Sequence, residues 1–256
     1  MYETIKTEFD GSIYIITINR PEKLNALNRT VIRELGEAVQ EVYDNHSIRA
    51  ALITGSGNKA FAAGADIRGF AGLTQEEGIA LARQGLEVFF KIENAPKPIV
   101  AAVNGFALGG GCELAMACHF RLCSDNAHFG QPEISLGLIP GYGGTQRLTN
   151  LIGKGPALEA ILTGNLIDAT GALQFGLVNY ITSPEELINK TKNILQQIIC
   201  KAPLAVSKCI QAVNAANLSS GYTLETKLFG ECFVTEDMKE GTTAFLEKRQ
   251  PVFKGR

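Results

Sequence analysis

Two glutamates stand in apolar stretches of the chain, 20 residues apart. Glu113 follows the glycine triplet at 109–111, and Glu133 follows Pro132. A buried carboxylate is costly unless it is paired or protonated, and burial raises its pKa toward the range useful for acid–base work. Two such groups that face one substrate can divide the roles of acid and base. The alternative for the first of them is a tight packing turn with a solvated glutamate.

Two glycine turns can supply backbone N–H groups to the same place. The apolar run at 101–108 breaks into Gly109–Gly111, where a helix is expected to begin, and the run at 60–63 breaks at Gly64 before Ala65. Glycine accepts positive φ and lets a ligand approach closely, and the first turn of a helix has unpaired N–H groups. Two N–H donors aimed at one point form an oxyanion hole.

No nearby side chain is placed as an activated nucleophile. Cys112 adjoins Glu113, but no histidine lies within that motif, and a nucleophilic thiol needs a base or a cation beside it. The residues therefore indicate proton chemistry next to a polarised carbonyl, without a covalent intermediate.

The elements that must position these groups alternate between strands and helices. Apolar and β-branched runs predict strands at 12–19, 50–55, 60–63, 101–108, 120–123 and 176–181. Helical spacing predicts helices at 28–44, 76–90, 113–118, 156–162 and 169–175, and continuously from 184 onward. Strand, glycine turn and helix recur without a long linker, which excludes an all-β sandwich and favours an α/β protein.

Composition narrows the class of protein further. The chain has 256 residues, is 45% hydrophobic and 20% charged, and has a net charge of −2, so no overall basic field indicates a nucleic-acid partner. No uncharged run is long enough to span a membrane. The dinucleotide fingerprint and the P-loop are both missing.

The cysteines and the N-terminus carry expectations about metal and location. The six cysteines form no CxxC pair, and His119 and His128 are not arranged with them as zinc ligands, so we expect no metal. The first three cysteines, at 112, 118 and 123, lie in an apolar context and are expected to be small buried thiols. The N-terminal residues show no signal or transit pattern. We expect a cytoplasmic protein, with a processed mitochondrial form left open.

At these residues the chain resembles the enoyl-CoA hydratase (crotonase) family. The resemblance runs from about residue 3 to the C-terminal tail, and it rests on several motifs in the family's order. These are NRPEKLNAL at 19–27, FAAGADI at 61–67, KPIVAAVNG at 97–105, GGGCEL at 109–114, FGQPE at 129–133 and PGYGGTQRL at 140–148.

The resemblance implies the crotonase (ClpP-like) fold, an α/β spiral of repeated ββα units. The helical pattern from 184 onward puts a boundary at about residue 195, so we expect the core with the catalytic site at 1–195 and, as the resemblance implies, a C-terminal helical trimerisation region at 196–256. It implies acyl-CoA thioesters as substrates with no separate cofactor, because coenzyme A is part of the substrate. It also implies a homotrimer or a homohexamer built as a dimer of trimers.

The resemblance also implies residue roles. The N–H groups of Ala65 and Gly110 would form the oxyanion hole, Glu113 would deprotonate water, and Glu133 would deliver a proton to the α-carbon. The N–H of Gly141 would hold the water or Glu133. The expected substrate and CoA contacts are Lys23, Leu24, Ala26, Ala63, Ala65, Asp66, Ile67 and Arg68, with Phe245 and Lys248 from a neighbouring subunit.

Two residues of these motifs have simpler interpretations. Asp66 is expected chiefly to tie down the loop that presents Ala65. His119 stands where many family members have an aspartate, and we expect it to be a packed or surface residue rather than a third catalytic group.

The presence of both glutamates favours hydration of a 2-trans-enoyl-CoA to a 3-hydroxyacyl-CoA, and equally its reversal, 3-hydroxybutyryl-CoA dehydration, in fatty acid or short-chain acyl-CoA metabolism. One alternative is a Δ3-Δ2-enoyl-CoA isomerase, which needs only one carboxylate. The other is a protein that keeps the fold as a non-catalytic scaffold or RNA binder.

Overall fold

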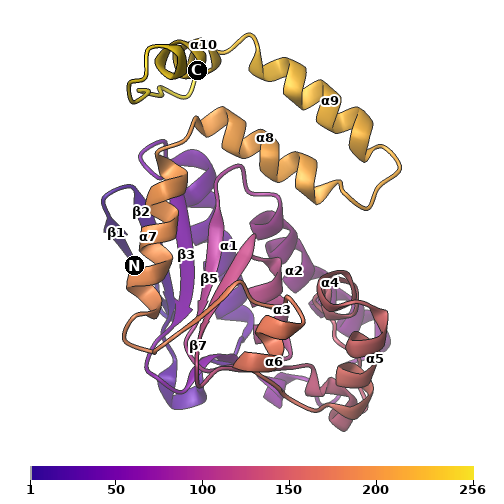
Figure 1. Ribbon diagram of the computed structural model, residues 1–256. Helices are drawn as coiled ribbons and strands as arrows, with labels where there is room; N and C mark the ends of the chain where they lie inside the picture. Colours follow the sequence, from indigo (N-terminus) through magenta and orange to yellow (C-terminus); the bar gives the residue numbers. More distant parts are fainter. Residues whose placement is uncertain (1) are drawn as a thin grey trace.

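The computed structural model describes residues 2–256, which form two β-sheets and ten α-helices (Figure 1). The larger sheet has the strand order β1-β2-β3-β5-β7-β10, and its neighbours are parallel except for β1 and β2. Its strands are β1 (Ile5–Asp10), β2 (Ile13–Ile18), β3 (Ala50–Gly55), β5 (Ile99–Val103), β7 (Phe120–Ser124) and β10 (Tyr180–Thr182).

The smaller sheet has the order β4-β6-β8-β9, and only its last pair is antiparallel. Its strands are β4 (Ala60–Ala63), β6 (Phe106–Leu108), β8 (His128–Gly130) and β9 (Ile167–Asp168). Each of the pairs β3–β4, β5–β6 and β7–β8 gives one strand to each sheet, and helices follow. The predicted α/β class and its ββα repeat are confirmed.

The helices fall into those that cover the sheets and those that extend beyond them. The covering helices are α1 (Arg29–Asp44), α2 (Gln75–Glu93), α3 (Gly110–Ala117), α4 (Gly144–Ile152), α5 (Lys154–Thr163), α6 (Ala169–Gln174) and α7 (Leu187–Ile199). Short 3₁₀ helices lie at η1 (Pro21–Lys23), η2 (Ile67–Gly69) and η3 (Pro132–Leu136).

The larger sheet is buried on both faces because successive strand side chains point in opposite directions. Ala51, Ile53 and Ala101 pack into the main core with α1, α2 and α3. Their neighbours Leu52 and Val100 pack instead under α7. This two-sided burial explains why the central strands are continuously apolar in sequence.

The predicted domain boundary at residue 195 falls inside α7. Leu195 and Leu187 of this helix are 0% and 1% exposed and pack against the sheet. The periodicity of the chain does not separate α7 from the helices after it, because all of them are amphipathic. The core therefore continues through α7 to Ile199.

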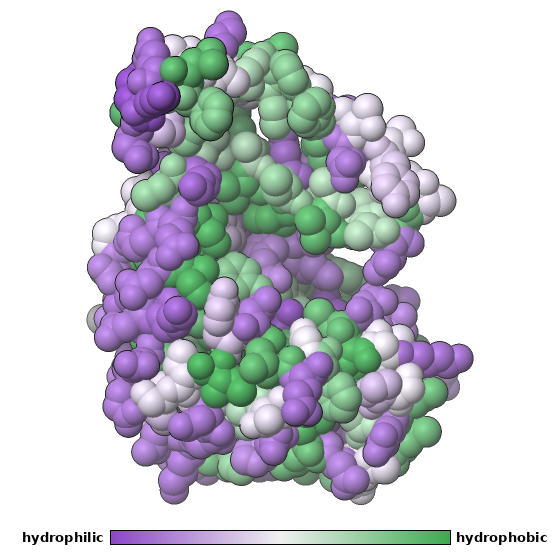
Figure 2. Space-filling view, viewed as in Figure 1, coloured by the Kyte–Doolittle hydropathy of each residue, from purple (hydrophilic) through white to green (hydrophobic). Residues whose placement is uncertain are grey.

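We call α8 (Pro203–Asn214), α9 (Gly221–Cys232) and α10 (Glu236–Leu246) the C-terminal arm. The arm extends away from the sheets (Figure 1), and α8 contains no buried residue while α9 contains only Leu228. Figure 2 shows apolar side chains gathered on this part of the surface. Phe229, Phe233 and Phe245 are among its exposed aromatic residues. The arm thus leaves a large apolar area without a partner within residues 2–256.

The helix ends follow the expected chemistry, and two edge strands do not. Asn28 caps α1 by accepting a hydrogen bond of 2.8 Å from the N–H of Val31, as its sequence position predicts. Strand β1 is not predicted from the sequence, because this edge strand is mostly exposed and polar. Predicted strand 176–181 shrinks to β10 because Leu177 instead turns back to bond Ala172. Across residues 2–256 we find no helix with the length and apolarity that crossing a membrane requires.

Candidate active site

The short helix α3 places Glu113 deep in the molecule. All eight of its residues are buried, and Glu113 itself is 1% exposed. The helix begins after Gly109, whose φ of 48° suits glycine. A Cβ on Gly111 would overlap the carbonyl oxygen of Ala62 in β4. The glycine triplet is therefore required for α3 to start this close to the smaller sheet.

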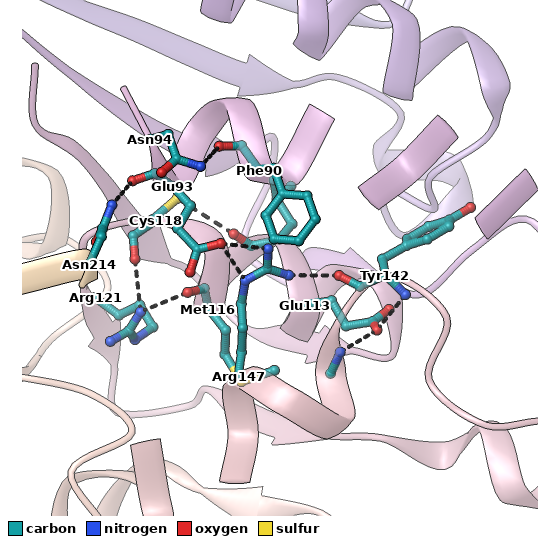
Figure 3. Close-up of polar contacts among 12 residues, drawn as sticks. Phe90, Glu93, Asn94, Glu113, Met116, Cys118, Arg121, Tyr142, Arg147 and Asn214 are labelled. Atoms are coloured by element: carbon teal, nitrogen blue, oxygen red, sulfur yellow. Dashed lines mark hydrogen bonds and ion pairs between the residues drawn. The ribbon is translucent and has the colours of Figure 1, made fainter. Parts of the chain in front are cut away.

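The loop before α4 holds the Glu113 carboxylate (Figure 3). The N–H groups of Tyr142 and Gly144 each donate to its Oε1 at 2.7 Å. Burial raises the pKa of Glu113 to about 7, and the charge of Glu133 adds to this rise. The N–H groups of Gly144 and Tyr142 and the charge of Arg147 act in the opposite direction and lower the pKa. Glu113 can therefore gain or lose a proton near neutral pH.

Glu133 has a different environment. It lies on η3, which contains no fully buried residue. Its Oε2 is buried and has no hydrogen-bond partner within residues 2–256, and burial raises the pKa of this carboxyl. A Cβ on Gly109 would lie 2.5 Å from Glu133 Oε1, so glycine at 109 leaves room for the carboxylate.

Two backbone N–H groups at the same site have no hydrogen-bond partner. Ala65 forms an isolated parallel bridge with Leu27 that uses the carbonyl of Gly64 and the N–H of Asp66. Leu27 makes both bonds of this bridge with the two neighbours of Ala65, so the N–H of Ala65 itself is left unpaired. Gly110 is the first residue of α3, where N–H groups have no partner inside the helix. Within the described chain, neither N–H donates a hydrogen bond.

One cleft of about 760 Å³ brings five of the predicted site residues together: Ala65, Gly110, Glu113, Glu133 and Gly141 all line it. Apolar side chains from the segment after η2, from α2 and from the loop before α4 form much of the remaining wall. These are Phe70, Leu73, Ile79, Leu81, Ala82, Leu138 and Ile139. The cleft therefore combines two carboxyls and two free N–H donors with an apolar wall.

Asp66 and Arg68 lie in a neighbouring cavity of about 460 Å³, which shares Tyr142 with the cleft. Arg68 Nε donates to Asp66 Oδ1 at 2.8 Å, and Arg20 lies 3.5 Å from Asp66 Oδ2. The hydrogen bonds from Arg68 hold the pKa of Asp66 well below its ordinary value. Asp66 is thus engaged in the loop beside Ala65, which confirms the expected tie, and Arg68 is already paired.

The other predicted contacts lie beside the cleft or far from it. The loop that carries Lys23, Leu24 and Ala26 pairs with the 63–66 segment, where Ala63 N–H donates to Leu24 O at 3.0 Å. None of the following residues lines either cavity: Lys23, Leu24, Ala26, Ala63, Ile67, Phe245 and Lys248. Phe245 and Lys248 are exposed on the arm.

His119 is a packed residue, as expected. Its Nδ1 accepts a 2.8 Å hydrogen bond from the N–H of Ile99. Burial lowers the pKa of the imidazole to about 4, so the ring is neutral at physiological pH. No group of three His, Cys, Asp or Glu side chains suited to a metal ion occurs in the part of the chain that the structure describes.

The donors that hold Glu113 are not among the residues predicted from the sequence. The N–H of Gly141 is expected to hold water or Glu133, and Gly141 does line the cleft, but the N–H groups of Tyr142 and Gly144 bind Glu113. The signal was present in the paired glycines at 143–144 that open α4. The cleft wall from α2 is also not predicted from the sequence, because its residues lie outside the motifs that carry chemistry.

Comparisons with known proteins agree with this geometry. A short-chain enoyl-CoA hydratase of Clostridium acetobutylicum is 46% identical over 246 residues, covering 95% of this chain and 94% of the relative. A crotonyl-CoA hydratase of Syntrophomonas wolfei is 46% identical over 255 residues, covering 98% of both. The crystal structure of an enoyl-CoA hydratase from Bacillus anthracis superposes with a TM-score of 0.94 at 35% identity, covering 99% of this chain and 100% of that one.

The family model for enoyl-CoA hydratase/isomerase matches residues 8–256. This match includes both glycine turns, both glutamates and the C-terminal arm. Together with the shared fold and the full-length relatives, it shows that this chain belongs to the enoyl-CoA hydratase/isomerase family, the crotonases.

Proposed function

We propose that the cleft adds water reversibly to short-chain 2-trans-enoyl-CoA thioesters, which makes the protein an enoyl-CoA hydratase, a hydro-lyase. One observation carries this proposal: two carboxyls with raised pKa line one cleft together with two unpaired N–H groups. The names of the relatives from Clostridium and Syntrophomonas support a short acyl chain. The apolar wall of the cleft suits the hydrocarbon part of such a substrate.

The reaction begins with polarisation of the thioester. The N–H groups of Ala65 and Gly110 bind the thioester oxygen and stabilise the negative charge that develops on it. This draws electrons from the double bond and makes the β-carbon electrophilic. The oxygen of a water molecule then bonds to the β-carbon, while the π electrons move toward the thioester oxygen to give an enolate.

The two glutamates move the protons. Glu113 takes one proton from the water, and Glu133 gives its proton to the α-carbon as the enolate collapses. Net addition of water results, and a proton passes from Glu113 to Glu133 through bulk water to restore the starting state. Dehydration follows the same path in reverse.

The environments of the glutamates support this division of roles. Two N–H donors favour the ionised form of Glu113, which a base requires. Glu133 has a buried oxygen without a partner and so favours the protonated form, which an acid requires. Gly141 lines the cleft and supplies an N–H group that would hold the attacking water or Glu133.

Coenzyme A binding and assembly belong to the same proposal. CoA is part of the substrate, and its phosphates would meet Lys23 and Arg68 beside the cleft, with Phe245 and Lys248 supplied by another subunit. The exposed apolar area of the arm supports assembly into a trimer or a dimer of trimers. Location in the cytoplasm remains a prediction.

The test is an assay of purified protein with crotonyl-CoA, followed at the absorbance of the conjugated thioester, against isomerisation of 3-butenoyl-CoA. Hydration that exceeds isomerisation by orders of magnitude supports the hydratase. Dominant isomerisation would favour the single-carboxylate alternative, and neither activity would favour the binding-protein alternative. A series of longer 2-enoyl-CoA substrates measures the preferred chain length, and light scattering measures the assembly.

A further inference from the structure

The mechanism does not use Arg147, although this residue carries a buried charge next to the site. Arg147 lies on α4, and its side chain is 8% exposed. Its Nη1 donates to the carbonyl oxygen of Tyr142 at 2.7 Å. The N–H of the same Tyr142 donates to Glu113. Both polar ends of this residue's backbone are therefore held, one by the guanidinium and one by the carboxylate (Figure 3).

The guanidinium is itself fixed by the end of α2. Arg147 Nη2 donates to Glu93 Oε2 at 2.8 Å, and Nε reaches the same oxygen at 3.3 Å. The Arg147 carbon Cζ lies 5.4 Å from the centroid of the Phe90 ring. An ion pair and a stacked ring leave the guanidinium little freedom, so its bond to the Tyr142 carbonyl has a defined direction.

The same point of α2 is bound by the C-terminal arm. Asn214, the last residue of α8, donates from Nδ2 to the backbone carbonyl of Glu93 at 2.7 Å. A continuous series of contacts thus runs from Asn214 through Glu93 and Arg147 to Tyr142 and Glu113 (Figure 3).

We propose that Arg147 is a positioning residue for Glu113, and that Asn214 makes this positioning depend on the docking of the C-terminal arm. The inference rests on the proposed function, in which Glu113 is the base. The ionisable and charged groups that face Glu113 are Glu133 from η3, Arg147 from α4, the Tyr142 phenol and the Cys112 thiol of its own helix. Arg147 is the cation among them.

The main test compares Arg147→Gln with Arg147→Lys in crotonyl-CoA hydration. The loss of the fixed bond to the Tyr142 carbonyl should lower kcat of Arg147→Gln about tenfold to a hundredfold, with KM nearly unchanged. The loss of positive charge should also move the acid limb of its pH profile to higher pH. Arg147→Lys keeps the positive charge but not the fixed bond. Its acid limb should therefore lie near the wild-type pH, while its kcat stays below the wild-type value.

Arg121→Gln is the matched control, because Arg121 is an equally buried arginine that does not contact the loop holding Glu113. It donates to the carbonyls of Leu177 and Cys118 and, at 3.4 Å, to those of Ala115 and Met116 at the far end of α3. It should lower the melting temperature and leave the acid limb in place. If Arg147→Gln behaves like Arg121→Gln, with a lower melting temperature and an unchanged limb, the positioning role is wrong.

Asn214→Ala tests the link to the arm. It should shift kcat and the acid limb in the same direction as Arg147→Gln but by less, and wild-type values for this variant would overturn the link. A wild-type protein without hydratase activity would contradict the proposed function instead. In that case the pH dependence of the melting temperature near neutrality still reports the ionisation of Glu113. Arg147→Gln should still move this dependence to higher pH.

Discussion

Glu113 and Glu133 line one cleft, but the two segments that carry them are built differently. Glu113 stands on an α-helix whose residues are all buried, and two backbone N–H groups hold its carboxylate. Glu133 stands on a 3₁₀ helix at the rim, with one oxygen buried and unpartnered. The first carboxylate is fixed in position, and the second retains capacity for a new hydrogen bond.

This difference shows how one cleft obtains an acid and a base from the same residue type. Burial raises the pKa of both groups. Two N–H donors, from Tyr142 and Gly144, then favour the ionised form of Glu113, whereas only the N–H of Glu133 itself acts in this way on Glu133. The separation depends on backbone geometry in the loop before α4, so it is not visible in the identities of the two residues.

The largest effect on activity is expected when either carboxylate is removed. Glu113→Gln and Glu133→Gln keep size and polarity but remove acid–base capacity. Each should lower kcat for crotonyl-CoA hydration by at least about a hundredfold, since general acid–base catalysis contributes about two to four orders of magnitude. KM should change little, because the oxyanion hole consists of backbone groups.

The double variant should lose less than the product of the single losses, because groups that act as one unit are not additive. Glu34→Gln is the matched control: Glu34 is buried like Glu113 but lies outside the cleft. Near wild-type activity in Glu133→Gln, with Glu113→Gln inactive, would contradict the two-carboxylate mechanism and favour the isomerase.

The next effect concerns stability and has opposite signs for Glu113 and Glu34. Burial raises the folded-state pKa of Glu113 from 4.5 to about 7, so the folded protein loses stability as pH rises through 7, by up to about 3 kcal/mol. Glutamine can still accept both N–H bonds. Glu113→Gln should therefore stabilise the protein at pH 8 more than at pH 5, measured by urea unfolding.

Glu34 should behave in the reverse way. Burial alone would raise its pKa, but the N–H groups of Glu3 and Thr4 and the Thr4 hydroxyl outweigh burial and lower it. Its stabilisation is present above its ordinary pKa and is lost as pH falls through the lowered value. Glu34→Gln should thus destabilise the protein at pH 8. Equal effects of the two substitutions would contradict the assigned environments.

The sequence predicted the chemistry better than the geometry that tunes it. The glycine turns and the apolar surroundings of Glu113 and Glu133 identified the site because they constrain the backbone locally. The donors at Tyr142 and Gly144 lie 29 and 31 residues from Glu113 in the chain. Their meeting depends on packing between α3 and α4, which no local pattern contains.

The fold shows the same limit. The central strands and α1 were predicted because burial and capping leave clear patterns. The edge strand β1 and the end of the core at α7 were not, since the first is mostly exposed and the second resembles the arm helices in its amphipathic pattern. Whether a helix covers the sheet or extends beyond it is decided by tertiary contacts.

A smaller and continuous effect is expected in the pH profile of kcat/KM for hydration. Glu113 must be ionised, so activity should fall about tenfold for each pH unit below about 7. Glu133 must hold a proton, and its raised pKa keeps it protonated above its usual range. In the residual activity of Glu133→Gln, the acid limb should stay close to its wild-type position, because a protonated Glu133 is as uncharged as the glutamine that replaces it. An acid limb near pH 4 in wild type would exclude a Glu113 with raised pKa.

The smallest effect on activity is expected from a change in the Tyr142 side chain, because the backbone of this residue holds Glu113. Its N–H holds Glu113, while its ring packs edge-on against Phe89 with centroids 5.5 Å apart. Tyr142→Phe removes only the hydroxyl and keeps both contacts, so kcat and the acid limb should stay within about twofold of wild type. Gly85→Ala is the informative partner, because its Cβ would overlap the Tyr142 ring, whereas the Cβ of Gly155→Ala on α5, outside the cleft, meets nothing within 4 Å. Gly85→Ala should impair hydration and Gly155→Ala should not. A large loss in Tyr142→Phe would place the phenol in the reaction and show that the fixed position of Glu113 is not due to the backbone alone.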